Sequence, residues 1–154
     1  MNSSAYGFGR YFEEFEIGAV MEHEPGKTIT ESDNNLFCLL TMNHHPVHLD
    51  WNYAASQQYG KVLVVGTLVF SVAVGLTVRD ISGKAIANLA YHEANHTAPV
   101  FIGDTIYART EVLGKRVSRS NPDRGIVKVK TEVFNQNDEV VLTFSRSVLI
   151  PLMK

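Results

Sequence analysis

The sequence contains little cysteine, and this excludes folds held together by disulfides. Cys38 is the only cysteine among the 154 residues, so no disulfide can form within the chain. This fits a reducing compartment, and we expect a cytoplasmic protein. Cys38 could be a nucleophile, but it lies in the apolar run 36–40, where a cysteine usually packs as a small hydrophobic side chain. We therefore expect Cys38 in the core.

Neither sign of charge dominates, and no apolar run is clearly long enough to cross a membrane. The formal net charge is -2, from 14 Lys and Arg against 16 Asp and Glu. Without a basic stripe or tail, we expect no nucleic-acid or membrane partner. Residues 1–10 lack the apolar segment of a signal peptide. The apolar stretch 62–78 is interrupted by glycine, serine and threonine, and predicts a buried helix instead.

The chain does contain enough apolar residues for one core. Hydrophobic residues make up 45% of it, and 154 residues is a common size for a single domain. No repeat or low-complexity block divides the sequence. We therefore expect one domain over residues 1–154.

The first third of the chain predicts a strand, a short helix and a loop. Residues 19–30 form a candidate strand interrupted at Pro25. Thr30 and the polar residues after it supply N-cap oxygens for a helix. Because Pro46 disfavours helical backbone at the residue before it, a loop over residues 41–48 should follow.

Two helices and four strands are predicted for the remainder. A short helix over residues 50–59 would be capped by Asp50 and would end at Gly60. Residues 66–81, which are almost all small or apolar, predict a central helix enclosed on most sides. Four runs rich in β-branched and aromatic residues, separated by turn signals, then predict antiparallel strands over residues 85–97, 104–115, 125–135 and 139–150.

One early strand, a buried helix and four long strands predict an α+β layer in which an antiparallel sheet wraps an apolar helix. This arrangement is the hot-dog fold. In the strand over residues 125–135, the later positions alternate apolar and charged residues, so one face should contact solvent. A sheet of this size usually hides its open edge against a second copy, so we expect a homodimer or a higher homo-oligomer.

Three segments carry a family resemblance. Residues 41–48 read T-M-N-H-H-P-V-H and are followed by Asp50 and two alanines. Residues 65–68 read V-G-T-L, and residues 98–105 read A-P-V-F-I-G-D-T. In this order the segments resemble those of MaoC-like dehydratases, the (R)-specific enoyl-CoA hydratases. The resemblance implies the hot-dog fold and a lyase that adds water to an enoyl-CoA, or removes it from a 3-hydroxyacyl-CoA.

The resemblance also implies site residues. In the family an aspartate and a histidine hold the attacking water, and a backbone N–H at the start of the central helix polarises the thioester carbonyl. His48 matches the histidine, Asn43 stands where the family has aspartate, and His45 stands where it has asparagine. An amide cannot accept a proton at physiological pH but can orient a water. His48 would then do more of the base work, with help from His45 or from a carboxylate brought by the fold.

Two further residues have two interpretations each. Asp50 could fix the tautomer of His48 or contact substrate, or it could simply cap the following helix. Gly66 is the candidate for the N–H that binds the thioester oxygen, but a glycine there could instead permit close packing of the helix. Both alternatives stay open at the level of sequence.

Two groups of histidines allow other interpretations. His44, His45 and His48 could suggest a metal site, but Pro46 spoils the helical spacing that such a pair needs, and no cysteine cluster accompanies them. We expect no metal and no redox cofactor, with the substrate carried as a coenzyme A thioester. In residues 91–96 strict alternation places His92 and His96 on one face of a strand. These polar groups could bind a carboxylate or hydroxyl of the substrate, or form a solvated face.

The resemblance therefore implies a hydro-lyase acting on an acyl-CoA. Residues 42–48, of the form M-N-x-x-P-V-H, resemble the branch of the family that handles short, branched or dicarboxylic acyl groups such as mesaconyl-CoA or itaconyl-CoA. One alternative is a non-catalytic module that binds acyl-CoA or regulates another protein, having lost the aspartate and turnover with it. Another alternative is a hot-dog thioesterase, which would need a carboxylate that residues 41–48 do not contain.

Overall fold

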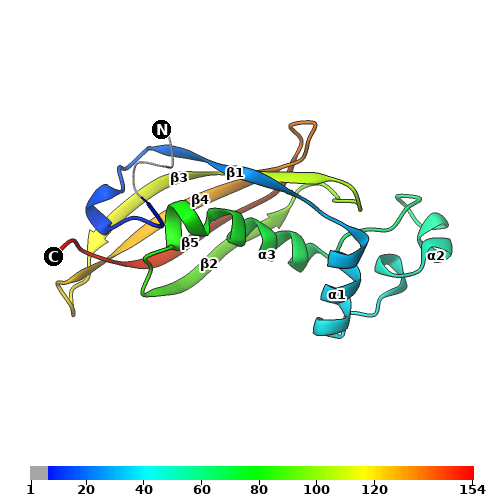
Figure 1. The fold of residues 1–154 in the computed structure, drawn as a ribbon, viewed down its shortest axis with the longest axis horizontal. Coiled ribbons are helices and arrows are strands. Elements are labelled where there is room, and N and C mark those ends of the chain that lie inside the picture. Colours follow the sequence, from blue (N-terminus) through cyan, green and yellow to red (C-terminus); the bar gives the residue numbers. More distant parts are fainter. Residues whose placement is uncertain (1–6) are drawn as a thin grey trace.

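The computed structural model describes residues 7–154, in which one antiparallel sheet lies against one long helix (Figure 1). The sheet order is β1-β3-β4-β5-β2. The strands are β1 (Val20–Thr28), β2 (Ala87–His96), β3 (Thr105–Val117), β4 (Arg124–Phe134) and β5 (Val140–Pro151). The helices are α1 (Glu31–Thr41), α2 (Trp51–Ala55) and α3 (Gly66–Thr77), with a π-helical turn at Val78–Ser82 and short 3-10 turns at Phe12–Glu14 and Pro46–His48. The predicted order of elements is confirmed.

Local hydrogen bonds explain where the first two helices begin and end. Thr30 caps α1 by accepting a hydrogen bond from the N–H of Asp33, whose carboxylate bonds back to Thr30 N at 2.8 Å. The predicted helix over residues 50–59 is wrong in its extent, because α2 ends at Ala55. There the N–H groups of Ser56 and Gln57 bond to the carbonyls three residues back, those of Tyr53 and Ala54, both at 3.0 Å, and this tighter 3-10 pattern replaces the α-helical one.

Helix α3 buries one face and leaves a stripe exposed. Leu68, Val69, Ala73 and Thr77 are buried within the domain, where each large apolar side chain contributes roughly 1.5–3 kcal/mol to folding. Thr67, Ser71 and Gly75 are exposed. The expectation of a helix enclosed on most sides is therefore wrong for the single chain, because the sheet covers only one face.

The predicted position of Cys38 in the core is confirmed, and burial there raises the pKa of its thiol.

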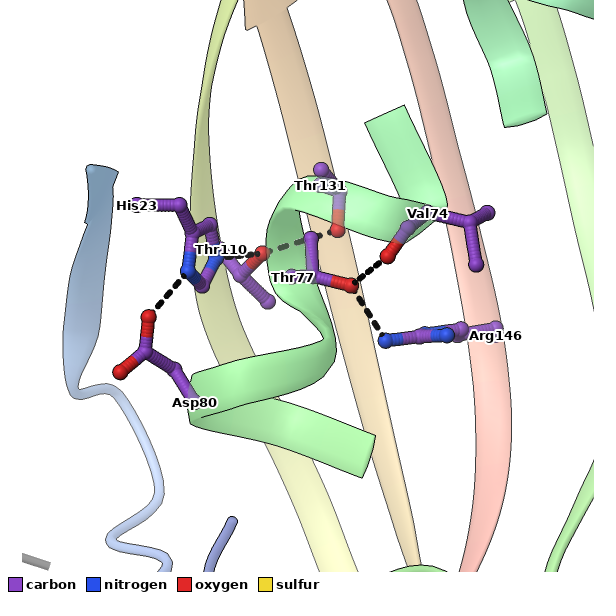
Figure 2. Close-up of polar contacts among 7 residues, drawn as sticks. All are labelled: His23, Val74, Thr77, Asp80, Thr110, Thr131 and Arg146. Atoms are coloured by element: carbon purple, nitrogen blue, oxygen red, sulfur yellow. Dashed lines mark hydrogen bonds and ion pairs between the residues drawn. The ribbon is translucent and has the colours of Figure 1, made fainter. Parts of the chain in front are cut away.

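A chain of polar contacts fastens the last turns of α3 to the sheet (Figure 2). His23 Nδ1 lies 2.8 Å from the carboxylate of Asp80, and its Nε2 lies 2.7 Å from the hydroxyl of Thr110. The carboxylate can only accept, so Nδ1 carries the proton and Thr110 donates to Nε2. Beside this pair the buried guanidinium of Arg146 donates to the hydroxyl of Thr77 at 2.6 Å. These contacts anchor one end of α3 and leave its other end, at Gly66, to the candidate site.

Strand β2 is an edge strand with two irregularities. Its register against β5 shifts between Asn88 and Ala90, and again between His92 and Asn95. The expected strict alternation over residues 91–96 is therefore wrong. His92 bonds weakly to Ser147 at 3.4 Å, whereas His96 lies against the first residue of α3.

The predicted solvent-exposed face of β4 is confirmed, because the side chains of Lys128 and Lys130 are exposed.

Helices α1 and α2 extend beyond the end of the sheet (Figure 1). Because nothing in the described chain covers their outer side, Leu36, Leu39 and Leu40 of α1 are each more than half exposed. Residues 41–48 connect these two helices at the end of the molecule where α3 begins. Among residues 7–154, no helix has both the length and the apolar character needed to cross a bilayer.

Candidate active site

His48 is held in one tautomer at the end of a 3-10 turn. Its Nδ1 lies 2.6 Å from the carbonyl oxygen of Leu63, and a carbonyl can only accept. Nδ1 therefore donates, and in the neutral ring the lone pair lies on Nε2. A fixed tautomer with a free ring nitrogen is the arrangement that a general base needs.

A buried asparagine joins this loop to α3. Asn34 of α1 is fully buried, and its amide nitrogen donates to the carbonyl of His48 at 2.9 Å. Its amide oxygen accepts from the backbone N–H of Val65 at 3.1 Å, one residue before α3 begins. One side chain thus sets the spacing between the loop and the start of the helix. Asn34 was not among the candidates from sequence, although its position four residues before Cys38, on the same buried face of α1, was a usable signal.

The side chains of Asn43 and His45 bond to backbone N–H groups of the loop itself. The amide oxygen of Asn43 accepts from the backbone N–H of His45 at 3.4 Å. His45 Nδ1 accepts from the N–H of Val47 at 3.1 Å, and the His45 ring lies edge-on to the rings of His48 and Tyr53, with centroids about 6 Å apart. The Asn43 and His48 side chains share no hydrogen bond with each other in the described part of the chain, and the expectation that they hold a water between them stays a prediction.

Asp50 caps α2, as one of its two interpretations predicted. Its carboxylate accepts from the N–H of Tyr53 at 2.8 Å. The alternative that Asp50 fixes the tautomer of His48 is wrong, because the carbonyl of Leu63 occupies Nδ1. The partner of the imidazole was not visible in the sequence because Leu63 lies 15 positions away and contributes only backbone.

A cavity of about 250 Å³ opens beside the first residue of α3. Its walls include Leu63, Gly66, Val69 and His96, with the hydroxyl-bearing Tyr59 at one side. Val65 offers no side-chain cap to α3, and the amides of Gly66 and Thr67 have no acceptor among residues 7–154. Free amides at a helix N-terminus favour a partly negative oxygen.

Gly66 also has a steric reason to be glycine. A Cβ added at this position would lie 3.1 Å from both Nε2 and Cε1 of His96. The absence of a side chain at Gly66 therefore does two things. It leaves room for the His96 imidazole of β2, and it leaves the N–H of Gly66 accessible from the cavity. No three His, Cys, Asp or Glu side chains gather closely enough to hold a metal ion anywhere in residues 7–154.

Curated relatives match most of the length of this chain. Over 92% of its length the chain is 33% identical to mesaconyl-CoA hydratase of Cereibacter sphaeroides and 35% identical to beta-methylmalyl-CoA dehydratase of Chloroflexus aurantiacus, covering 41% and 40% of those proteins. The chain thus spans about two-fifths of the length of these relatives. It is 30% identical to (R)-specific enoyl-CoA hydratase of Aeromonas caviae over 75% of the chain and 81% of that enzyme.

Solved structures agree with the fold. The monoamine oxidase regulatory protein of Archaeoglobus fulgius superposes with a TM-score of 0.83 and 34% identity, covering 97% of this chain and 99% of that one. A Mycobacterium tuberculosis protein with a double hot-dog fold superposes with a TM-score of 0.86 and 27% identity, over 94% of this chain and 45% of that one. The expected α+β hot-dog fold is confirmed.

The sequence matches the MaoC like domain over residues 13–134, a range that contains α1, the loop with His48, α3 and strands β1 to β4. With this match and relatives above 30% identity, the chain belongs to the MaoC-like dehydratase family.

Proposed function

We propose that this domain is a hydro-lyase that adds water to, or removes it from, a short-chain acyl-CoA thioester. The observation that carries the proposal is the fixed tautomer of His48, whose Nδ1 donates to the carbonyl of Leu63, a residue that lines the same cavity as Gly66 with its free amide. This combination supplies a base and an oxygen-binding donor, which hydration of an unsaturated thioester requires.

The proposed reaction uses His48 for both proton transfers. In hydration, Nε2 takes one proton from water while the water oxygen bonds to the β-carbon of the acyl group. The π electrons move onto the thioester to form an enolate, whose oxygen accepts a hydrogen bond from Gly66. The α-carbon then takes the proton from His48, so one water is added and the imidazole is neutral again. Acid–base catalysis of this kind contributes roughly 10²- to 10⁴-fold.

The cavity and the relatives support a short acyl group. About 250 Å³ lies below the roughly 300–1,000 Å³ of pockets for drug-sized ligands. Two relatives are named for mesaconyl-CoA and beta-methylmalyl-CoA. We therefore propose a branched or dicarboxylic acyl group of this size, with the coenzyme A arm outside the cavity.

Two assays test this function. The protein is incubated with mesaconyl-CoA, itaconyl-CoA and crotonyl-CoA, and both the enoyl absorbance and free thiol are followed. We expect absorbance to fall without thiol release, as hydration requires. Thiol release would instead support the thioesterase alternative.

His48→Ala tests the residue that carries the proposal. Loss of the proposed base should lower kcat by roughly 10²- to 10⁴-fold. The ring is half-buried with one hydrogen bond, so its loss should change the thermal midpoint little. His44→Ala, an exposed histidine in the same loop, is the matched control and should keep wild-type kcat. Equal kcat in both variants would overturn the role of His48.

A non-catalytic module is the second candidate. Asn43 replaces the family's aspartate, and one structural relative over nearly its whole length is a regulatory protein. Tight binding of acyl-CoA with no absorbance change for any of the three substrates would favour this function over the lyase.

A further inference from the structure

The imidazole of His96 lies directly beside the start of α3. His96 is the last residue of β2, and its Nε2 and Cε1 lie 3.1 Å from the point where a Cβ on Gly66 would be. Such a contact is tighter than ordinary van der Waals distance, so Gly66 is the residue type that leaves room for this ring. Both residues are walls of the same cavity of about 250 Å³.

The rings of four histidines have polar partners, namely His23, His45, His48 and His92, whereas the ring of His96 has none among residues 7–154. His23 bonds to Asp80 and Thr110, and His48 bonds to the carbonyl of Leu63. No hydrogen bond to the His96 ring occurs among residues 7–154. A polar ring at a cavity wall therefore keeps both nitrogens available for a ligand.

The amides beside this ring are also available. Val65 cannot cap α3, and its own N–H is taken by Asn34, which leaves the amides of Gly66 and Thr67 without an acceptor in the described chain. Because Nε2 of His96 adjoins Gly66, one ligand oxygen at the start of α3 lies within reach of a backbone amide and of the ring together.

We propose that His96 is a catalytic residue whose Nε2–H donates a hydrogen bond to the thioester carbonyl oxygen, beside the amide of Gly66. The inference rests on the proposed function and deepens it, because it assigns a second donor to the enolate oxygen. No bond to His96 forms or breaks. Its proton stays on Nε2 while negative charge grows on the oxygen, and the charge returns to carbon when the α-carbon is protonated.

A second donor suits a site that lacks the family's aspartate. With an amide at Asn43, the loop holds no carboxylate to share the base work with His48, so water attack depends more on stabilising the enolate. Removing one oxyanion donor typically lowers kcat by about 10²- to 10³-fold.

The test uses the carbonyl stretching band of [1-¹³C]butyryl-CoA, followed by difference infrared spectroscopy on the intact protein. Butyryl-CoA has no double bond and cannot be hydrated, so the band reports polarisation of the carbonyl whether or not the protein is a hydratase. The variants are His96→Phe, which removes the donor, and His96→Gln, which restores an N–H near Nε2. His92→Phe, on the same strand and bonded only weakly to Ser147, is the matched control.

We expect wild type and His92→Phe to shift the bound band to lower wavenumber, His96→Phe to lose at least half of that shift, and His96→Gln to regain part of it. With an enoyl-CoA that wild type hydrates, kcat of His96→Phe should fall about 10²- to 10³-fold with little change in KM. An unchanged band in His96→Phe overturns the inference. Failure of wild type to bind butyryl-CoA, or to shift its band, overturns it as well. Absence of hydration in wild type contradicts the proposed function alone.

Discussion

His48 acquires its tautomer from a backbone carbonyl, and this affects how it handles a proton. A carbonyl fixes Nδ1–H as a carboxylate would, but it carries only a partial negative charge. The imidazolium formed during water attack is therefore stabilised less than one paired with a carboxylate. This favours quick return of the proton to the α-carbon, which the proposed single-base reaction requires.

Asn43→Asp tests whether the site still needs the family's acid. The amide oxygen of Asn43 already bonds to the N–H of His45, and a carboxylate oxygen can accept the same bond. We expect kcat to change by less than about tenfold, which corresponds to about 1.4 kcal/mol in the barrier. Steady-state kinetics with the best enoyl-CoA measures it. A gain of a hundredfold or more would show that the site lacks a second base.

Residues of the site differ in how far the sequence revealed them. His48 and Gly66 could be proposed from sequence because they lie in short motifs, and the capping role of Asp50 was one of the two interpretations proposed for it. Asn34 and Leu63 act through hydrogen bonds between segments 14 to 31 positions apart, which no local pattern encodes. The position of His96 depends on a register shift in β2, so alternation along the strand misplaced it.

At the scale of elements, the buried His23 should make stability depend on pH. Burial lowers the pKa of His23 below its usual 6.5, despite the opposing effect of Asp80. The unfolded chain therefore takes up a proton near pH 6.5 that the folded chain refuses, so stability present above pH 6.5 is lost as pH falls toward the folded pKa. One proton gives a slope of at most about 1.4 kcal/mol per pH unit.

Thermal unfolding between pH 7 and pH 5 measures this slope. We expect the midpoint of wild type to fall over that range and the midpoint of His23→Gln to fall less. His92→Gln is the control, because His92 is exposed and should keep the wild-type slope. Parallel curves for His23→Gln and wild type would show that another group titrates instead.

Strands and helices were predictable here because composition and turn signals mark them directly. The four later strands match the predicted ranges within about two residues, since β-branched runs alternate with clusters of Asn, Asp, Gly and Pro. The end of α2 was not predictable, because it depends on the N–H groups of Ser56 and Gln57 bonding to carbonyls three residues back, which no residue type in the segment marks. The π-helical turn at Val78–Ser82 carries Asp80, which bonds to His23 from β1.

The whole molecule leaves apolar surface that a second copy would cover. Strand β2 is exposed at nine of its ten positions, and unpaired edge strands favour association. Ile86 and Leu89 at this edge are each nearly half exposed, and the leucines of α1 add a second apolar surface. We propose a homodimer in which two β2 edges pair.

The mass in solution tests this assembly. Sedimentation of wild type should give twice the chain mass of 17.1 kDa. The double variant Ile86→Lys with Leu89→Lys should shift toward the single-chain mass, because lysines on an edge strand oppose pairing with another edge. Leu113→Lys with Val117→Lys is the matched control, since both residues are similarly exposed but lie on β3, inside the sheet. A dimer of unchanged affinity in the first variant would place the interface elsewhere, and a single-chain mass for wild type would exclude it.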